Sequence, residues 1–315
     1  MGEKHHNWHD RYRRAHPTEW HGRPEIGSGT KLWQCIECVD LRHKLPSLKK
    51  LPAFGLLGFA CDKGIRRNQG RPGAEEGPYA MREALSNIAL HITRPASFYD
   101  FGDIICHDGM LANGQEALAQ VVTMLIQHGI SPILMGGGHE IAWGHYQGLT
   151  RAFPDTSPSI INIDAHFNLK PLHKKKASSG TPFRQIAMLC EKSDKEFDYS
   201  CIGIQPFSNT PELFSEAKKR NVEYITAEQV HFHTGKSYQA ILNKVGTKQD
   251  PLYLSLDLHA FASSFAPGVS SPQPMGLFPW QVVPLLEAIA SMDKVITFDV
   301  AELSPPLDHD GMTAR

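Results

Sequence analysis

Polar side chains that could bind a metal follow several apolar, strand-like runs of this chain. The run at residues 159–164 ends in Asp164, and His166 and Asn168 follow at spacings of two. Other runs are followed by potential ligands at His139, at Asp257 and His259, and at Glu302. Open α/β sheets place their sites outside the carboxyl ends of the strands, so we expect these side chains to lie together. A cluster of imidazole and carboxylate groups is typical of a site for manganese, iron or zinc.

Each of these motifs has a simpler explanation when it is taken alone. A strand followed by a polar turn accounts for Asp164 to Asn168, and a tight turn with a surface histidine accounts for the glycines before His139. The metal-site hypothesis therefore depends on a fold that brings the separate motifs together.

Strand-like and helix-like segments alternate from residue 54 almost to the C-terminus. The strand-like segments are 54–60, 97–102, 131–135, 159–164, 200–204, 222–225, 252–257 and 294–300. The helix-like segments between them are 77–90, 113–129, 140–152, 183–192, 210–220, 236–246 and 279–291. Strands separated by helices favour a mainly parallel sheet with helices on both faces, because parallel neighbours need long right-handed connections. We therefore expect a single α/β domain at 51–315, preceded by a polar N-terminal arm at 1–50.

Composition and charge exclude several classes of protein. Of the 315 residues 41% are apolar and 21% charged, and the formal net charge of −1 gives no support for nucleic acid or an anionic membrane as a partner. No run approaches the roughly 18–20 apolar residues of a membrane span, and the His/Arg-rich start has no apolar signal core. Six scattered cysteines in a chain of this length indicate reduced thiols. We expect a cytoplasmic protein that acts on a small molecule.

Four longer segments carry distinctive motifs. They are 58–71 (Gly-Phe-Ala-Cys-Asp-Lys-Gly-Ile-Arg-Arg-Asn-Gln-Gly-Arg), 136–145 (Gly-Gly-Gly-His-Glu-Ile-Ala-Trp-Gly-His), 178–185 (Ser-Ser-Gly-Thr-Pro-Phe-Arg-Gln) and 266–272 (Ala-Pro-Gly-Val-Ser-Ser-Pro). These segments resemble the arginase or ureohydrolase superfamily, and within it the formimidoylglutamase branch. The resemblance covers nearly the whole chain from about residue 54. It implies a three-layer α/β/α sandwich with an eight-stranded, mainly parallel sheet, and it makes a homo-oligomer an expectation.

The resemblance also implies a pair of Mn²⁺ ions. It assigns four metal ligands, of which Asp164 and Asp257 bridge the two ions: His139, Asp164, His166 and Asp257. Asn168 and His259 stand where the family has its other two aspartates. A set of two His and four Asp carries a formal charge of −4, whereas the three His, two Asp and one Asn of this chain carry −2. Uncompensated charge is costly in a buried site, so we expect weaker metal binding, with one ion instead of two, or none.

The activity that the resemblance implies is hydrolysis of a C–N bond in a linear amidine by metal-activated hydroxide. The products from N-formimidoyl-L-glutamate are formamide and L-glutamate, as in histidine degradation. Asp164 and Glu302 are the expected catalytic residues. Asp164 is one of the two bridging metal ligands that the resemblance implies, and Glu302 resembles the family acid that holds the cationic amidine. The two carboxylates of the substrate need cationic or polar partners, for which we expect Arg184 first, and then Arg66, Arg67, Asn68 and Arg71. For any single arginine among these, a surface ion pair is as good an explanation as substrate binding.

Two alternative functions stay open. A ureohydrolase acting on arginine or agmatine is disfavoured, because Phe183 stands where arginases keep a proton-shuttling histidine. A catalytically inactive, metal-deficient relative with a binding or regulatory role is favoured by Asn168 and His259. In such a metal-free site, Asp164 and Asp257 are predicted to draw His259 toward its charged form.

Overall fold

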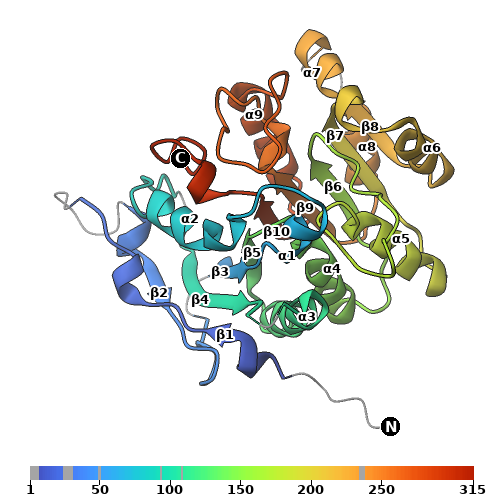
Figure 1. Ribbon diagram of the computed structural model, residues 1–315. Coiled ribbons are helices and arrows are strands. Elements are labelled where there is room, and N and C mark those ends of the chain that lie inside the picture. The colour runs from blue at the N-terminus through green and yellow to red at the C-terminus, as the bar shows by residue number, and fades with distance from the viewer. Residues whose placement is uncertain (1–6, 24–30, 49–50, 93, 108, 234–237) are drawn as a thin grey trace.

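Eight parallel strands form the central sheet of the computed structural model, which describes all residues except 1–6, 24–30, 49–50, 93, 108 and 234–237. Their order across the sheet is β4-β3-β5-β10-β9-β6-β7-β8 (Figure 1). The strands are β3 (Ala53–Ala60), β4 (Ser97–Ile105), β5 (Ser131–Gly136), β6 (Ser159–Ile163), β7 (Tyr199–Ile204), β8 (Glu223–Thr226), β9 (Leu252–Asp257) and β10 (Val295–Ala301). Each predicted strand is confirmed, with bounds that shift by a few residues at most.

The strand order brings distant parts of the chain together at the centre of the sheet. The chain crosses from β5 through a helix to β6 and leaves a gap that the last two strands, β9 and β10, later fill. Register pairs such as Val300 with Met135, Ala301 with Asp257, and Ile163 with Leu256 align the carboxyl ends of the four strands. The predicted metal ligands all follow these four adjacent strands.

Helices cover both faces of the sheet, which gives the expected three layers (Figure 1). One face is covered by α3 (Leu111–Gln127), α4 (Ile141–Ala152), α5 (Pro182–Lys192) and α6 (Pro211–Lys219). The other is covered by α2 (Gly77–Ser86), α7 (Ala227–His233), α8 (Gln239–Thr247) and α9 (Pro279–Ala290). Strands enclosed by two helical layers are apolar on both sides, and every residue of β6 and β9 is buried.

Two short helices were not expected from the sequence. The helix α1 (Lys63–Arg67) has only five residues, and α7 carries few apolar residues at helical spacing, so neither shows a clear period. The helix α1 lies beside the carboxyl ends of the central strands and carries two of the predicted arginines (Figure 1).

Residues of the predicted N-terminal arm extend the sheet at its β4 edge. The strand β1 (Tyr12–Arg13) pairs antiparallel with β4, and β2 (Ile36–Cys38) pairs parallel with it. The buried guanidinium of Arg82 anchors this edge, because it contacts Asp100 at 2.7 Å and Asp103 at 2.8 Å. The division of the chain at residue 51 stays a prediction. Among the described helices, none is long and apolar enough to cross a membrane.

Candidate metal and substrate site

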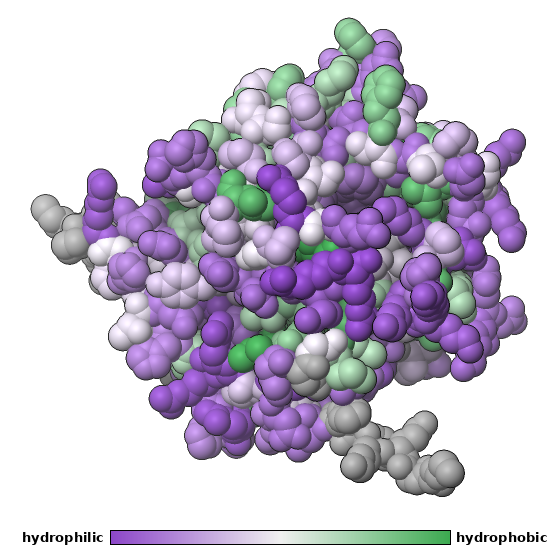
Figure 2. All heavy atoms as spheres, viewed as in Figure 1, coloured by the Kyte–Doolittle hydropathy of each residue, from purple (hydrophilic) through white to green (hydrophobic). Residues whose placement is uncertain are grey.

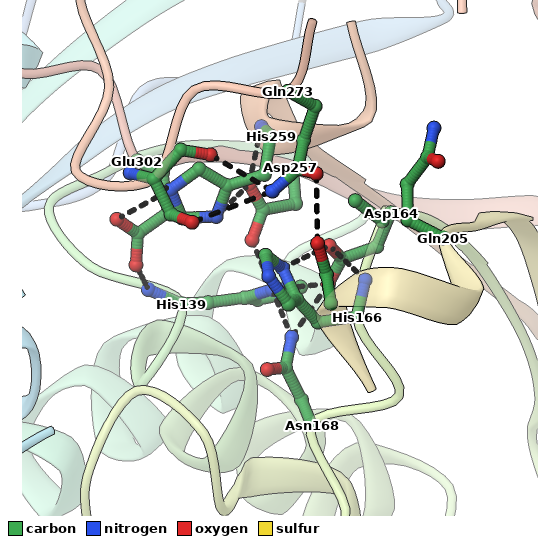
Figure 3. Close-up of polar contacts among 12 residues, drawn as sticks. His139, Asp164, His166, Asn168, Gln205, Asp257, His259, Gln273 and Glu302 are labelled. Carbon is green, nitrogen blue, oxygen red and sulfur yellow. Dashed lines mark hydrogen bonds and ion pairs between the residues drawn. The ribbon is translucent and has the colours of Figure 1, made fainter. Parts of the chain in front are cut away.

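The predicted ligands meet in one buried cluster at the carboxyl ends of β5, β10, β9 and β6. Figure 3 shows their side chains pointing toward one another from four separate loops. Three groups within the cluster have ligand atoms within 4.8 Å of one another. These groups are His139 with Asp164 and Asp257, Asp164 with His166 and His259, and Asp257 with His259 and Glu302. The structure thus gathers the residues that the sequence placed at strand ends.

Glycine residues allow the loop after β5 to reach the cluster. The amide of Gly137 donates to the Phe59 carbonyl and that of Gly138 donates to the Cys61 carbonyl, both at 2.9 Å. A Cβ atom on Gly137 would lie 1.7 Å from the Cys61 carbonyl oxygen, so no larger residue fits there. This close approach of two backbones sets the position of His139.

His139 lies at the centre of the cluster and is almost fully buried. Its Nδ1 atom lies 2.7 Å from Oδ2 of Asp257 and 3.1 Å from Oδ2 of Asp164. Its Nε2 atom lies 3.0 Å from the Ser255 hydroxyl, which donates to Asp299 at 2.7 Å. Burial opposes a charge on the ring, but Asp257 and Asp164 outweigh it and raise the pKa of His139 well above its ordinary value.

Asp299 and Ser255 were missed as site residues by sequence reasoning. Both are buried polar residues inside apolar strands, and Asp299 also accepts a hydrogen bond from Nδ1 of His145 at 2.6 Å. A polar residue in a strand enclosed on both faces needs a partner. That signal, together with His145 in the 136–145 motif, could have identified them.

His259 occupies a pocket that stabilises positive charge. Nδ1 lies 3.0 Å from Oδ1 of Asp257, and Nε2 lies 3.5 Å from Oε2 of Glu302. Burial lowers the pKa of His259, but Asp257, Glu302 and Asp164 raise it to about 9. These carboxylates favour the predicted charged form, with Glu302 contributing more than Asp164, and the protonation state of His259 stays a prediction. The amide of Ser271 lies 3.0 Å from Nε2 and points its hydrogen at that atom, a geometry that suits the neutral ring instead.

Asn168 contacts its neighbours through its amide nitrogen. Nδ2 donates to Oδ2 of Asp164 at 2.5 Å and lies 2.9 Å from Nδ1 of His139. The backbone φ of Asn168 is 50°, a left-handed conformation that asparagine tolerates better than most residues. In this orientation Asn168 stabilises the negative charge of Asp164, and a 180° rotation of the amide would present its oxygen to the cluster instead.

Glu302 lies on the opposite side of the cluster from Asn168 (Figure 3). Its Oε1 accepts the amide of His139 at 2.9 Å, and its Oε2 accepts the Ser270 hydroxyl at 2.9 Å. The backbone φ of 76° is unfavourable for glutamate, and the amide is held by the Gly137 carbonyl at 2.8 Å. Burial raises the pKa of Glu302, while His259 opposes the rise.

The cluster forms the floor of a cleft of ≈ 280 Å³. The cleft is also lined by Asn68, Lys170, Ser179, Ser208, Asn209 and Ser270. A larger hollow of ≈ 660 Å³ between α2 and the C-terminal residues contains none of the predicted ligands. Of the residues predicted to bind substrate, Asn68 therefore lies in the cleft.

The predicted arginines have other partners in the structure. Arg184 does not line the cleft but pairs with Glu216 on α6 at 2.8 Å, and its role in substrate binding stays a prediction. Arg66 pairs with Asp62 at 2.8 Å, and Arg71 donates to the carbonyls of residues 269 and 270. Arg67 donates to the Ala177 carbonyl at 3.1 Å. Helix geometry turns Arg184 toward α6, which the periodicity of its own helix does not reveal.

Lys170 is the cation that sequence reasoning missed. Among the residues that the structure describes, it is the only Lys or Arg that lines the cleft, and its Nζ donates to Asn68 Oδ1 at 3.1 Å. Burial lowers the pKa of Lys170, although part of the side chain is exposed. No local pattern marked Lys170, because the chain turns at Asn168, whose φ is 50°.

The donor set of the cluster fits a divalent transition metal. Oδ2 of Asp257 is buried and has no hydrogen-bond partner among the described residues, although Nδ1 of His139 lies 2.7 Å away outside hydrogen-bond geometry. A buried carboxylate oxygen without a hydrogen bond is costly, and a metal ion in place of the proton on His139 would compensate its charge. His139, Asp164, His166, Asp257 and His259 are the residues that would hold the ion.

Comparison with known proteins identifies the family. Residues 52–315 match the model of the arginase family. The chain belongs to the arginase family. A formimidoylglutamase of Legionella pneumophila (strain Lens) is 42% identical over 305 residues, which are 96% of this chain and 94% of the relative. A formimidoylglutamase of Geobacillus thermodenitrificans is 40% identical and covers 93% of this chain and 90% of its own length.

Solved structures agree with the arginase fold. Formimidoylglutamase from Bacillus subtilis superposes with a TM-score of 0.81 at 24% identity, covering 94% of this chain and 90% of its own. Trypanosoma cruzi formiminoglutamase with Mn²⁺ superposes with a TM-score of 0.74 at 25% identity, covering 83% of this chain and 89% of its own. The fold shared with these proteins accounts for the sheet order of this chain.

Proposed function

We propose that this arginase-family chain hydrolyses N-formimidoyl-L-glutamate to formamide and L-glutamate. The observation that carries the proposal is the buried cluster of His139, Asp164 and Asp257, which opens into a cleft with a cation, Lys170, in its wall. Several relatives of 38–42% identity that match nearly this whole chain are formimidoylglutamases. A homo-oligomer and a cytoplasmic location stay predictions.

The reaction adds water across the amidine carbon and breaks its bond to the glutamate nitrogen. The oxygen of water ends in formamide, and the released amine takes up a proton to become glutamate. A divalent metal held by the residues of the cluster would supply the Lewis acidity that activates water near neutral pH. The remaining steps depend on groups of the chain that bind and orient the substrate.

We infer that Glu302 and Lys170, which both line the cleft, bind different charged groups of the substrate. The Glu302 carboxylate lines the cleft and is held by the His139 amide and the Ser270 hydroxyl, so it can accept hydrogen bonds from a cationic amidine. Lys170 can pair with a substrate carboxylate from the wall of the same cleft. Phe183 is fully buried and packs edge-on against His139, with ring centroids 5.4 Å apart, so it supplies no proton shuttle.

We further propose that the cluster holds one divalent ion instead of two. Asp164 and Asp257 together balance the charge of a single divalent ion, and Asn168 presents its amide nitrogen to Asp164. A second ion would leave two positive charges uncompensated in a buried site, where such charge is expensive. The negative charge of Glu302 compensates the charge of a second ion only in part, because both carboxylate oxygens already accept hydrogen bonds.

One experiment tests the activity directly. The metal content of the purified protein is measured by elemental analysis, and formamide release from formimidoylglutamate is followed with and without added Mn²⁺. We expect metal-dependent formamide release and no urea from arginine or agmatine. Urea release would favour the ureohydrolase alternative. Absence of metal and of both products, even with added Mn²⁺, would favour the binding or regulatory alternative suggested by Asn168 and His259.

A further inference from the structure

A second pocket, of ≈ 220 Å³, lies beside the substrate cleft. It shares Asn68 and Lys170 with the cleft, so the two hollows are neighbours. Its other lining residues are Arg67, Pro171, His173, Lys176 and Ser178. We name the basic vestibule after its four basic side chains, Arg67, Lys170, His173 and Lys176. No carboxylate lines this pocket among the described residues.

The charges of the basic vestibule are not neutralised by the chain. Arg67 donates to the Ala177 carbonyl and Lys170 to the Asn68 amide oxygen, both of which are neutral. Within the described ranges, neither Lys176 nor the His173 ring has a side-chain hydrogen bond or ion pair. The adjacent Arg66, in contrast, pairs with Asp62 at 2.8 Å. The vestibule therefore presents positive charge that is free to meet an anion.

A tight turn holds two members of the vestibule opposite each other. His173 and Lys176 form an isolated antiparallel bridge, and the Lys176 amide donates to the His173 carbonyl at 2.9 Å. The two residues at the tip, Lys174 and Lys175, have φ values of 50° and 61°. Such turns favour Asn-Gly, and a pair of lysines is disfavoured there. Strained backbone of this kind tends to occur at functional sites.

The face shown in Figure 2 is strongly hydrophilic at its centre, over the place of α1 in Figure 1. The vestibule residue Arg67 is the last residue of α1. The end of α1 that carries Arg67 therefore belongs to this hydrophilic face.

We propose that the basic vestibule is an anion subsite that holds the substrate carboxylate farther from the reacting carbon. The inference rests on the proposed function, whose substrate carries two carboxylates while the cleft offers one ammonium, Lys170. Arg67 and Lys176 supply the additional positive charge for the second carboxylate. The vestibule thereby selects dicarboxylates over amino acids with an apolar side chain.

Calorimetric binding tests the vestibule without any turnover. The probes are L-glutamate and L-norvaline, which have side chains of similar size and differ in the distal carboxylate. Lys176→Gln removes a vestibule charge, and Lys175→Gln is the matched control, because it removes the same charge from a residue that does not line the pocket. Thermal melting of both variants shows whether they are folded.

We expect the wild-type protein to bind glutamate about tenfold more tightly than norvaline, as a charge-assisted contact predicts. Lys176→Gln should remove most of this preference, and Lys175→Gln should change it by less than about twofold. Equal binding of the two probes, or equal effects of the two variants, would overturn the proposal. The protein could also prefer glutamate in a way that depends on Lys176 and yet release no formamide. That result would support the vestibule as an anion subsite and would count against the proposed activity only.

Discussion

The hydroxyl of Ser255 joins His139 to a buried carboxylate: its Oγ lies 3.0 Å from Nε2 of His139 and donates to Asp299 at 2.7 Å. This contact fixes the ring so that its other nitrogen faces Asp164 and Asp257. Ser255→Ala should weaken metal binding by about 10- to 100-fold, as loss of a group that orients a ligand does. The measurement is calorimetric titration of the metal-free protein with Mn²⁺. Ser200→Ala, in the neighbouring part of the sheet, is the control and should leave the affinity unchanged.

The double variant Asn168→Asp/His259→Asp should bind more manganese than the wild-type protein, with two ions in place of one. The change restores a set of four carboxylates around two histidines and so compensates the charge of a second divalent ion. Without metal, the added carboxylates repel Asp164 and Asp257, so the variant should melt at a lower temperature until Mn²⁺ is added. Metal content by elemental analysis gives the stoichiometry. An unchanged content would contradict the charge argument.

The metal-free protein should lose stability as the pH rises from about 6.5 to about 9. Asp257 and Glu302 raise the pKa of His259 to about 9 in the folded protein. A pKa raised on folding stabilises the protein below the unfolded value of about 6.5, and that stabilisation disappears as the pH passes through the folded value. The loss is on the order of 3 kcal/mol.

Denaturant unfolding with a chelator at pH 6, 7.5 and 9 measures this loss. His259→Gln should flatten the pH dependence, although His139, whose pKa is also raised, keeps part of it. With metal bound the trend should reverse, because protons and metal compete for the same imidazoles. A wild-type protein that is equally stable at all three pH values would exclude the charged state of His259.

Lys170→Ala should raise KM for formimidoylglutamate by about tenfold or more, because it removes the ammonium from the cleft wall. Arg184→Ala is the matched control and should change KM by less than about twofold, since Arg184 pairs with Glu216 outside the cleft. Steady-state kinetics of formamide release give both values. The opposite ranking would restore Arg184 to the substrate site.

Arg82→Leu should destabilise the protein by about 3–5 kcal/mol, because it leaves Asp100 buried without its cation and Asp103 with only the half-exposed Arg13. Arg13→Ala removes a half-exposed partner of Asp103 and should cost about 1 kcal/mol or less. Chemical denaturation of the two variants measures the difference. Similar losses for both would show that the Arg82 network contributes no more than a surface ion pair.

Much of the fold was evident in the sequence because its signals are local. Apolar runs of strand length separated by helical periods define β3 to β10, and the structure confirms each of them. The strands β1 and β2 were missed because two or three residues that pair along one edge show no period of their own. Their partner is β4, far along the chain, so only the folded sheet reveals the pairing.

The sequence by itself determined which residues could bind a metal and how much charge they carry, because residue type and position after a strand are local properties. Only the tertiary structure decided which groups meet. The late insertion of β9 and β10 between β5 and β6 brings Asp257 and Glu302 to His139 and Asp164. The paths of loops and helices place Lys170 in the cleft and turn Arg184 toward Glu216. Such contacts join residues far apart in the chain, and no local pattern encodes the distance between them.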